Sequence, residues 1–203
     1  MNITYNNFFD QDIILENEIV RIEPLQQKHF EPLLPVAVND DIWRYKSVQI
    51  RSAADFKKYF DTAITEKQTK KAYPFAFYDK INNKYAGSTR FGNIDFNNKR
   101  LEIGWTWIDQ PLHGTGFNKN CKYLLLNFGF DTLNLNRIEL KTSLTNLRSQ
   151  KAMLKIGAVK EGVFRSHSIN EDGSIRNSVF FSFIKPEWEQ TKQDFFPDYI
   201  NRK

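Results

Sequence analysis

The spacing of apolar residues predicts a first strand and then several helices in the N-terminal third of the chain. Residues 13–24 form an apolar run that predicts the strand. Residues 27–38, 40–45 and 52–66 have helical patterns, and Ser52 is a suitable N-cap for the last of them. Two or three helices are therefore expected before the main sheet.

From residue 73 the pattern changes to that of strands. Residues 73–78, 85–94 and 100–108 are strand-like runs, and Asn, Asp and Lys fill the turns between them. This order predicts an antiparallel meander.

A helix and a further strand follow the meander. Residues 117–132 carry apolar residues at helical spacing, and Cys121 lies in that apolar stripe. Residues 137–142 alternate between charged and apolar side chains, as in a half-buried strand. A strand, a crossover helix and a second strand imply a parallel pair, with the connecting loop at the carboxyl end of the first strand.

The remaining pattern predicts a helix and a closing hairpin. Residues 146–156 form a helical pattern that ends at Gly157, and Ser149 lies on its inward face. Residues 159–168 and 176–184 predict two strands joined by a polar turn. The order of elements predicts an α+β fold with a mixed central sheet.

Length and composition predict one compact unit. The chain has 203 residues, including 18 Phe, 8 Tyr and 4 Trp, which is enough to form a full hydrophobic core. We predict an N-terminal tail at residues 1–12, a single domain at residues 13–188 and a C-terminal tail at residues 189–203.

Charge and cysteine content argue against several classes of protein. The formal net charge of +5 attracts polyanions, but the basic residues are scattered, so nucleic-acid binding is not expected. Cys121 is the single cysteine, so no internal disulfide and no C-x-x-C metal motif can form. No segment approaches the roughly 18 apolar residues that span a membrane, and the first residues do not resemble a secretion signal. We expect a cytoplasmic protein that uses no metal.

The loop before the helix at residue 117 is the strongest functional signal. It consists of His113, Gly114, Thr115, Gly116, Phe117 and Asn118. Glycines let backbone amides approach a ligand closely, and the start of a helix attracts phosphate. The Lys and Ser or Thr of a nucleotide-hydrolysing P-loop are absent after Gly116, and dinucleotide-binding folds need a parallel sheet before the loop. The pyrophosphate of a different cofactor fits better.

Four segments in this order resemble the GNAT acetyltransferases. They are Leu101-Glu102-Ile103-Gly104-Trp105, His113-Gly114-Thr115-Gly116-Phe117-Asn118, Asn146-Leu147-Arg148-Ser149 and Gly157-Ala158-Val159-Lys160-Glu161-Gly162. Within that family the chain resembles the ribosomal-protein-alanine N-acetyltransferase branch, from about Val20 to Trp188. The resemblance implies a GNAT-like mixed, splayed sheet flanked by helices, with acetyl-CoA as cosubstrate between the fourth and fifth strands.

The resemblance also implies which residues bind the cofactor. They are Trp107, Ile108, His113, Gly114, Thr115, Gly116, Phe117, Asn118, Asn146 and Ser149. Gly116 matches the family's pattern, whereas His113 replaces Gln or Arg and Asn118 replaces Gly or Ala. Backbone amides supply most phosphate contacts, so these departures bear on affinity more than on the existence of the site. Asn146 would hold the pantetheine arm, act as a helix N-cap, or both.

Acetyl transfer needs a neutral amine, a polarised thioester carbonyl and a proton for the leaving thiolate. Regular alternation places Glu102 on one strand face with Gly104 and Thr106, where it is either a base or a solvated cross-strand partner. The opposite face would carry Leu101, Ile103, Trp105 and Trp107. Many family members have a Tyr where this chain has Met153, and the resemblance implies that Ser149 protonates or orients the sulfur instead.

The acceptor is the least constrained part of the prediction. Branch resemblance implies a protein N-terminus or a small-molecule amine, acetylated by direct attack in a ternary complex, and it is compatible with a homodimer. The candidates for acceptor binding are Trp43, Tyr45, Trp105 and His167. His167 is also a second candidate base, and core packing explains the aromatic residues equally well. A non-catalytic module that binds acyl-CoA is the alternative.

Overall fold

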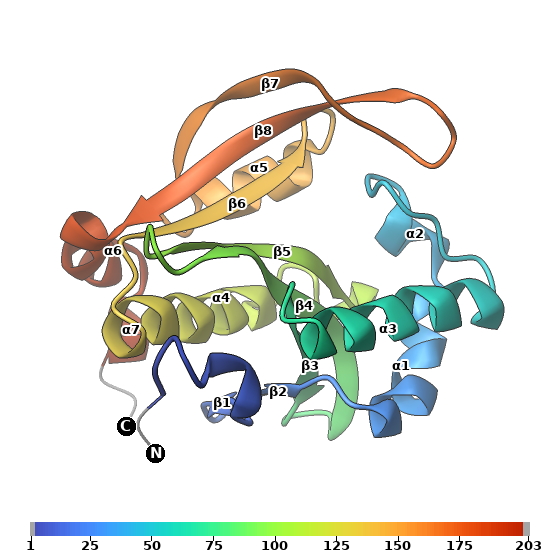
Figure 1. The fold of residues 1–203 in the computed structure, drawn as a ribbon, viewed down its shortest axis with the longest axis horizontal. Helices are drawn as coiled ribbons and strands as arrows, with labels where there is room; N and C mark the ends of the chain where they lie inside the picture. Colours follow the sequence, from blue (N-terminus) through green and yellow to red (C-terminus); the bar gives the residue numbers. More distant parts are fainter. Residues whose placement is uncertain (1–2, 201–203) are drawn as a thin grey trace.

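The computed structural model describes residues 3–200, and it confirms the predicted α+β fold. The sheet has eight strands in the order β1-β2-β3-β4-β5-β6-β8-β7 (Figure 1). Their bounds are β1 (Leu15–Glu16), β2 (Val20–Pro24), β3 (Tyr73–Asp79), β4 (Lys84–Asp95), β5 (Arg100–Ile108), β6 (Arg137–Ser143), β7 (Val159–Ile169) and β8 (Ile175–Ile184). β5 and β6 are parallel, and all other neighbouring strands are antiparallel.

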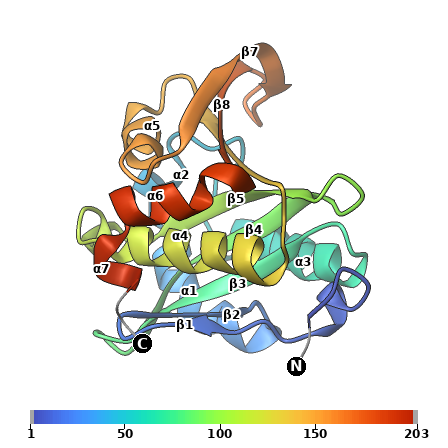
Figure 2. The same ribbon diagram turned by 90° about the vertical axis from the view of Figure 1, so that its left-hand side faces the viewer.

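Helices cover both faces of this sheet. They are α1 (Phe30–Ala37), α2 (Asp40–Trp43), α3 (Ala53–Gln68), α4 (Phe117–Asn127), α5 (Leu147–Leu154), α6 (Trp188–Phe195) and α7 (Pro197–Ile200). Figure 2 shows α4 and α6 on one side of the strands and α1 and α3 on the other. Ser52 caps α3 as predicted, because its hydroxyl accepts a hydrogen bond from the Asp55 amide at 3.2 Å.

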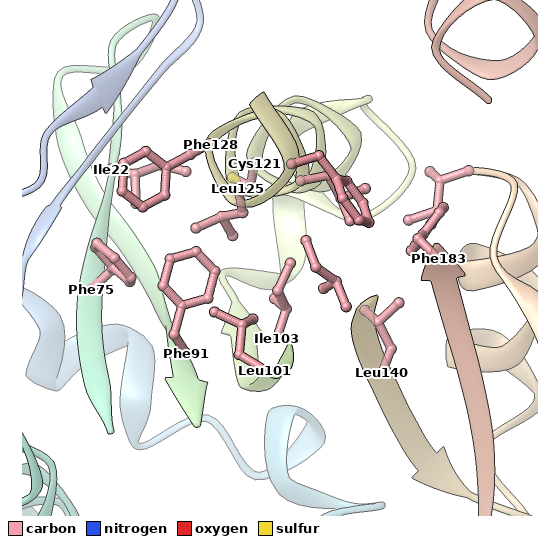
Figure 3. Packing of buried hydrophobic residues seen from close by; sticks show 14 of the residues in the cluster. Ile22, Phe75, Phe91, Leu101, Ile103, Cys121, Leu125, Phe128, Leu140 and Phe183 are labelled. Carbon is pink, nitrogen blue, oxygen red and sulfur yellow. The ribbon is translucent and has the colours of Figure 1, made fainter. Parts of the chain in front are cut away.

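Two hydrophobic clusters fix these layers. In the cluster under α4, side chains from the strands point toward Cys121 and Leu125 (Figure 3). The strand residues of that cluster include Ile22, Phe75, Phe91, Leu101 and Ile103. The second cluster lies under α1 to α3 and contains Trp43, Phe56 and Trp107. Cys121 is fully buried, which agrees with its predicted place in an apolar stripe.

The single strand expected at residues 13–24 is wrong, because this segment forms the hairpin of β1 and β2. The side-chain oxygen of Asn17 accepts hydrogen bonds from the amides of Ile19 and Val20 at 2.9 and 3.0 Å. The Asn17 amide donates to the carbonyl of Val20 at 3.0 Å, which closes the turn. A polar side chain that bonds the backbone locally turned an apolar run into two strands.

The segments expected as terminal tails contribute to the core. Phe8 is fully buried, and its ring lies 5.1 Å from that of Tyr73. Phe196 is also fully buried, with its ring 5.3 Å from that of Tyr123. The domain limits at residues 13 and 188 stay a prediction, and these contacts favour a domain that includes both segments.

A buried histidine joins β2 to the start of α1. The Gln26 amide donates to Nδ1 of His29 at 2.9 Å, so Nε2 carries the ring proton and donates to Oε1 of Glu23 at 2.9 Å. Tyr85 donates to the same carboxylate oxygen at 2.8 Å. Burial lowers the pKa of His29, and the attraction of Glu23 offsets this only in part. His29 is therefore held in its neutral form.

We expect this histidine to make stability depend on pH. Its folded pKa lies below the unfolded value of about 6.5, so the unfolded chain binds the extra proton and the stability contributed by neutral His29 is lost as pH falls below that value. Urea denaturation between about pH 7.5 and 5.5 should show a smaller loss of stability in His29→Gln than in wild type. Equal losses in both proteins would contradict this assignment.

Candidate active site

The parallel pair β5 and β6 is held together only at its beginning. Arg100, Leu101 and Glu102 pair with residues 137–139, and no further pairs join the two strands. β6 continues along β8, while β5 continues along β4. The sheet therefore splays after Glu102, as expected.

A β-bulge in β5 lies just beyond that point. Ser88 pairs with Trp107 and Arg90 with Gly104, so Thr89 stands opposite two residues of β5. One of those two, Trp105, has a φ of +54°. The extra residue reverses the alternation of side chains for the rest of the strand.

The bulge corrects the predicted faces of β5. Trp105 lies over Gly92, the pairing partner of Glu102, so Trp105 and Glu102 share a face. Trp107 packs in the cluster under α1 to α3, whereas Thr106 points to α4. The expectation that Trp105 and Trp107 lie opposite Glu102, and Thr106 beside it, is therefore wrong.

Glu102 is a cross-strand partner but not a solvated one, because it is only 3% exposed. Its Oε2 accepts a hydrogen bond from Nδ2 of Asn93 at 2.7 Å and lies 2.9 Å from Nζ of Lys141 on β6. The ion pair spans the splay between β5 and β6. If Glu102 acts as a base, the positive charge of Lys141 stabilises its carboxylate before the proton arrives.

The glycine loop before α4 presents open backbone. Gly114 and Gly116 have φ values of +82° and +90°, and a Cβ on either would meet no atom within 4 Å. Gly116 is the N-cap residue of α4 and offers no side-chain cap. The first amides of the helix therefore lack partners inside it, and the Phe117 amide makes a long hydrogen bond of 3.3 Å to the Thr115 hydroxyl. Such amides are available to an anion.

Polar side chains around the loop also fit a phosphorylated cofactor. Nη1 of Arg148 lies 3.3 Å from Nδ1 of His113, which brings a guanidinium group to the loop. Burial and then the charge of Arg148 lower the pKa of His113. The side-chain oxygen of Asn118 is buried without a hydrogen-bond partner among residues 3–200. That oxygen is an acceptor and cannot bind a phosphate, but donor amides and a cation gather where the pyrophosphate of acetyl-CoA is expected.

The sequence places Arg148 on a solvated helix face, with a contact to the 3′-phosphate of the cofactor as the alternative, and the structure brings its guanidinium group to His113. The side-chain oxygen of Asn146 accepts a hydrogen bond from the Ser149 amide at 3.0 Å, so Asn146 is the N-cap of α5. This bond fixes the orientation of the Asn146 amide group. Within residues 3–200, the hydroxyl of Ser149 makes no hydrogen bond and is half-buried.

The four acceptor candidates lie in different environments. Trp43 is buried in the cluster under α1 to α3, and its Nε1 donates to the carbonyl of Ala37 at 2.6 Å. Tyr45 lines a cleft of about 520 Å³ between the segment after α2, the end of β6 and the β7–β8 turn. Trp105 is 38% exposed and His167 lies on β7, but neither lines this cleft.

Comparison with known proteins decides the family. The profile described as "Acetyltransferase (GNAT) domain" matches residues 20–159, which is more than half of the chain. The chain belongs to the GNAT acetyltransferase family. Members of this family use acetyl-CoA as the acetyl donor.

Individual relatives support the same GNAT assignment. An uncharacterized N-acetyltransferase, p20 of Bacillus licheniformis, is 32% identical over 56% of this chain and 63% of its own length. The ribosomal-protein-serine acetyltransferase of Escherichia coli is 22% identical over 79% of this chain and 90% of its length. A GCN5-related N-acetyltransferase from Brucella melitensis has a similar crystal structure, with a TM-score of 0.84 and 27% identity over 91% of this chain and 84% of the other.

Neither a metal-binding cluster nor a membrane-spanning helix is found in the described part of the chain. Among residues 3–200, no three or more His, Cys, Asp or Glu side chains are grouped so as to hold a metal ion. In the same part of the chain, no helix combines the length and apolar character needed to cross a membrane.

Proposed function

We propose that this GNAT protein transfers an acetyl group from acetyl-CoA to a primary amine, by direct attack in a ternary complex. The observation that carries the proposal is the open glycine loop that follows the carboxyl end of β5, the strand that separates from β6 after Glu102. The loop supplies donors for a pyrophosphate, and the bulge in β5 redirects backbone groups at the splay. Similarity to the ribosomal-protein-serine acetyltransferase supports the α-amine of a protein N-terminus as the acceptor. A small-molecule amine is the alternative acceptor.

We assign separate roles to the residues around the splay. Amides of the loop from His113 to Asn118 hold the pyrophosphate, and Asn146 holds the pantetheine arm. Backbone groups of Trp107 and Ile108 contact the thioester end. Glu102 accepts the amine proton, directly or through water. An α-amine with a pKa of about 7.7 to 8.0 is already partly neutral near pH 7, so a weak base is sufficient.

A thiol-release assay tests this function. Acetyl-CoA and a panel of peptides with free N-termini and small amines should give CoA in proportion to acetylated product. Saturable binding of acetyl-CoA with no CoA release on any acceptor would instead support the non-catalytic acyl-CoA-binding module. Met153, which stands where many family members have a Tyr, is the feature that favours this second candidate.

Ser149→Ala is expected to lower kcat by about 100-fold, in line with the usual contribution of a positioned proton donor. The reason is that this half-buried hydroxyl has no partner within the described residues and is our candidate for protonating the thiolate. The Kd for acetyl-CoA should change little, and Ser149→Thr should recover part of the rate. An unchanged kcat in Ser149→Ala would assign the proton to water or to another group.

A further inference from the structure

Four cationic side chains line the cleft that contains Tyr45, and two of them, Lys46 and Arg176, are not fully exposed. Neither of these two has a carboxylate partner among the described residues. Nζ of Lys46 donates to the carbonyl oxygen of Thr106, in the β5 bulge, at 2.6 Å. Nη1 of Arg176, on β8, donates to the carbonyl of Tyr45 at 3.3 Å and to the hydroxyl of Ser47 at 3.0 Å. Both side chains are half-buried, and within residues 3–200 no ion pair includes either of them. Most of their donor capacity remains available.

More positive charge lies close by. Nζ of Lys122, a buried residue of α4, donates to the Thr106 hydroxyl at 3.0 Å, so two ammonium groups bond to one threonine. Burial, and then the charges of Arg176 and Arg148, lower the pKa of Lys46 to about 8. Gathering cations away from water costs free energy unless an anion joins them.

The nearby acids do not supply that anion. The charge of Glu102 acts on both Lys122 and Arg176, but Glu102 is already paired with Lys141. Four further acids line the same cleft and are exposed to solvent. They are Asp40, Asp41, Glu171 and Asp172. None of them forms an ion pair with Lys46 or Arg176 among the described residues.

The phosphates of the cofactor do not account for Lys46 and Arg176 either. The proposed pyrophosphate site is at the start of α4, where Arg148 and His113 meet. Lys46 lies close enough for the charge of Arg148 to act on it, but its Nζ bonds to the β5 bulge from the segment after α2, and Arg176 reaches the same segment from β8. Figure 1 shows the β7–β8 hairpin extending toward α2 on this side of the molecule. An anion that binds Lys46 and Arg176 would therefore enter through the cleft that they line. We expect this anion to be part of the acceptor.

We propose that Lys46 and Arg176 bind a carboxylate that the acceptor carries close to its amine. This inference rests on the proposed acetyl transfer and defines its acceptor class. An acidic side chain in the first two residues of a peptide, or the α-carboxylate of a free amino acid, has the required chemistry. Arg176 and Lys46 then have the charged partner that they lack in the free protein.

Matched acceptors test the proposal. Peptides that begin Ala-Asp and Ala-Asn, peptides that begin Asp-Ala and Asn-Ala, and a free amino acid with its amide differ only in the carboxylate. Acetyl transfer to the acidic member of at least one pair should have a kcat/KM about tenfold higher or more, since a hydrogen bond to a charged group contributes at least that factor. The pair that shows the preference identifies the source of the carboxylate.

Variants show whether the two cations cause that preference. Lys46→Met and Arg176→Gln should each reduce the acid-to-neutral ratio of kcat/KM toward 1, mainly through KM for the acceptor. Lys46→Arg, which keeps the charge, should restore the ratio. Lys57→Met is the matched control, because Lys57 is an exposed lysine of α3 that pairs with Asp61 at 2.6 Å. This control should keep the wild-type ratio.

The outcomes separate this inference from the proposed function. Acetylation of acidic and neutral acceptors with equal kcat/KM would leave the function standing and overturn the inference. If no acceptor is acetylated, calorimetric titration of the same pairs into the CoA-loaded protein decides. Tighter binding of the acidic member, lost in Lys46→Met, would support the carboxylate site, and equal or absent binding would overturn it.

Discussion

A Gly116→Val variant is expected to bind acetyl-CoA about 100-fold more weakly than the wild-type protein. Gly116 has a φ of +90°, and its missing side chain leaves open space in front of the first amides of α4. A valine would place carbon atoms where a phosphate must lie and would separate it from those amides. The loss of two hydrogen bonds to a charged group, at about 1.5 kcal/mol each, corresponds to roughly that factor.

Gly173→Val is the matched control for Gly116→Val. Gly173 lies in the β7–β8 turn, has a φ of +82°, and also has open space where a Cβ would be. Both variants carry the strain of a left-handed β-branched residue, but only Gly116→Val changes the loop before α4. Calorimetric titration with acetyl-CoA measures the difference. Equal affinities in the two variants would place the cofactor elsewhere.

Phe196→Ala is expected to lower the free energy of unfolding by about 3–5 kcal/mol, the usual cost of removing a fully buried phenylalanine. The Phe196 ring packs against Tyr123 of α4 and lies 6.1 Å from the ring of Trp188. Its removal would leave a cavity between the C-terminal helices and the main core. Urea denaturation followed by far-UV circular dichroism measures the change.

Ile169→Ala is the control for Phe196→Ala. Ile169 is 73% exposed at the end of β7, so its truncation should change the free energy of unfolding by less than about 0.5 kcal/mol. A change below about 1 kcal/mol in Phe196→Ala would mean that the C-terminal segment is a dispensable tail, as the predicted limit at residue 188 implies.

Hydrophobic periodicity predicted most helices and strands, because each of these elements buries one apolar face against a single neighbouring layer. The apolar stripe around Cys121 became α4, and the runs at residues 73–78, 85–94 and 100–108 became β3, β4 and β5. Ser52 was identifiable as a cap because its bond is to the backbone three residues away. Such features depend on neighbours in the chain, and the sequence contains those neighbours.

The sequence predictions were wrong at two places where hydrogen bonding or strand pairing interrupts the regular alternation of side chains. The hydrogen bonds of Asn17 divided one apolar run into β1 and β2. In β5 the bulge at Trp105 reversed the faces that alternation assigned to Thr106 and Trp107. Gly104 in β5 is consistent with a bulge, a close ligand approach or simple packing, and only the pairing of β4 with β5 decides among them.

The order of motifs along the chain was enough to identify the family, and it predicted a phosphate site at the loop from His113 to Asn118, since backbone amides and glycines act locally. The tertiary structure alone decided which cations gather at the β5 bulge and in the neighbouring cleft. Lys46, Lys122 and Arg176 come from three distant elements and carry no shared motif. Charge acts through space, so only folding brings Lys46 and Lys122 to Thr106 and places Arg176 in the cleft beside Lys46, which is why we expect an acidic acceptor.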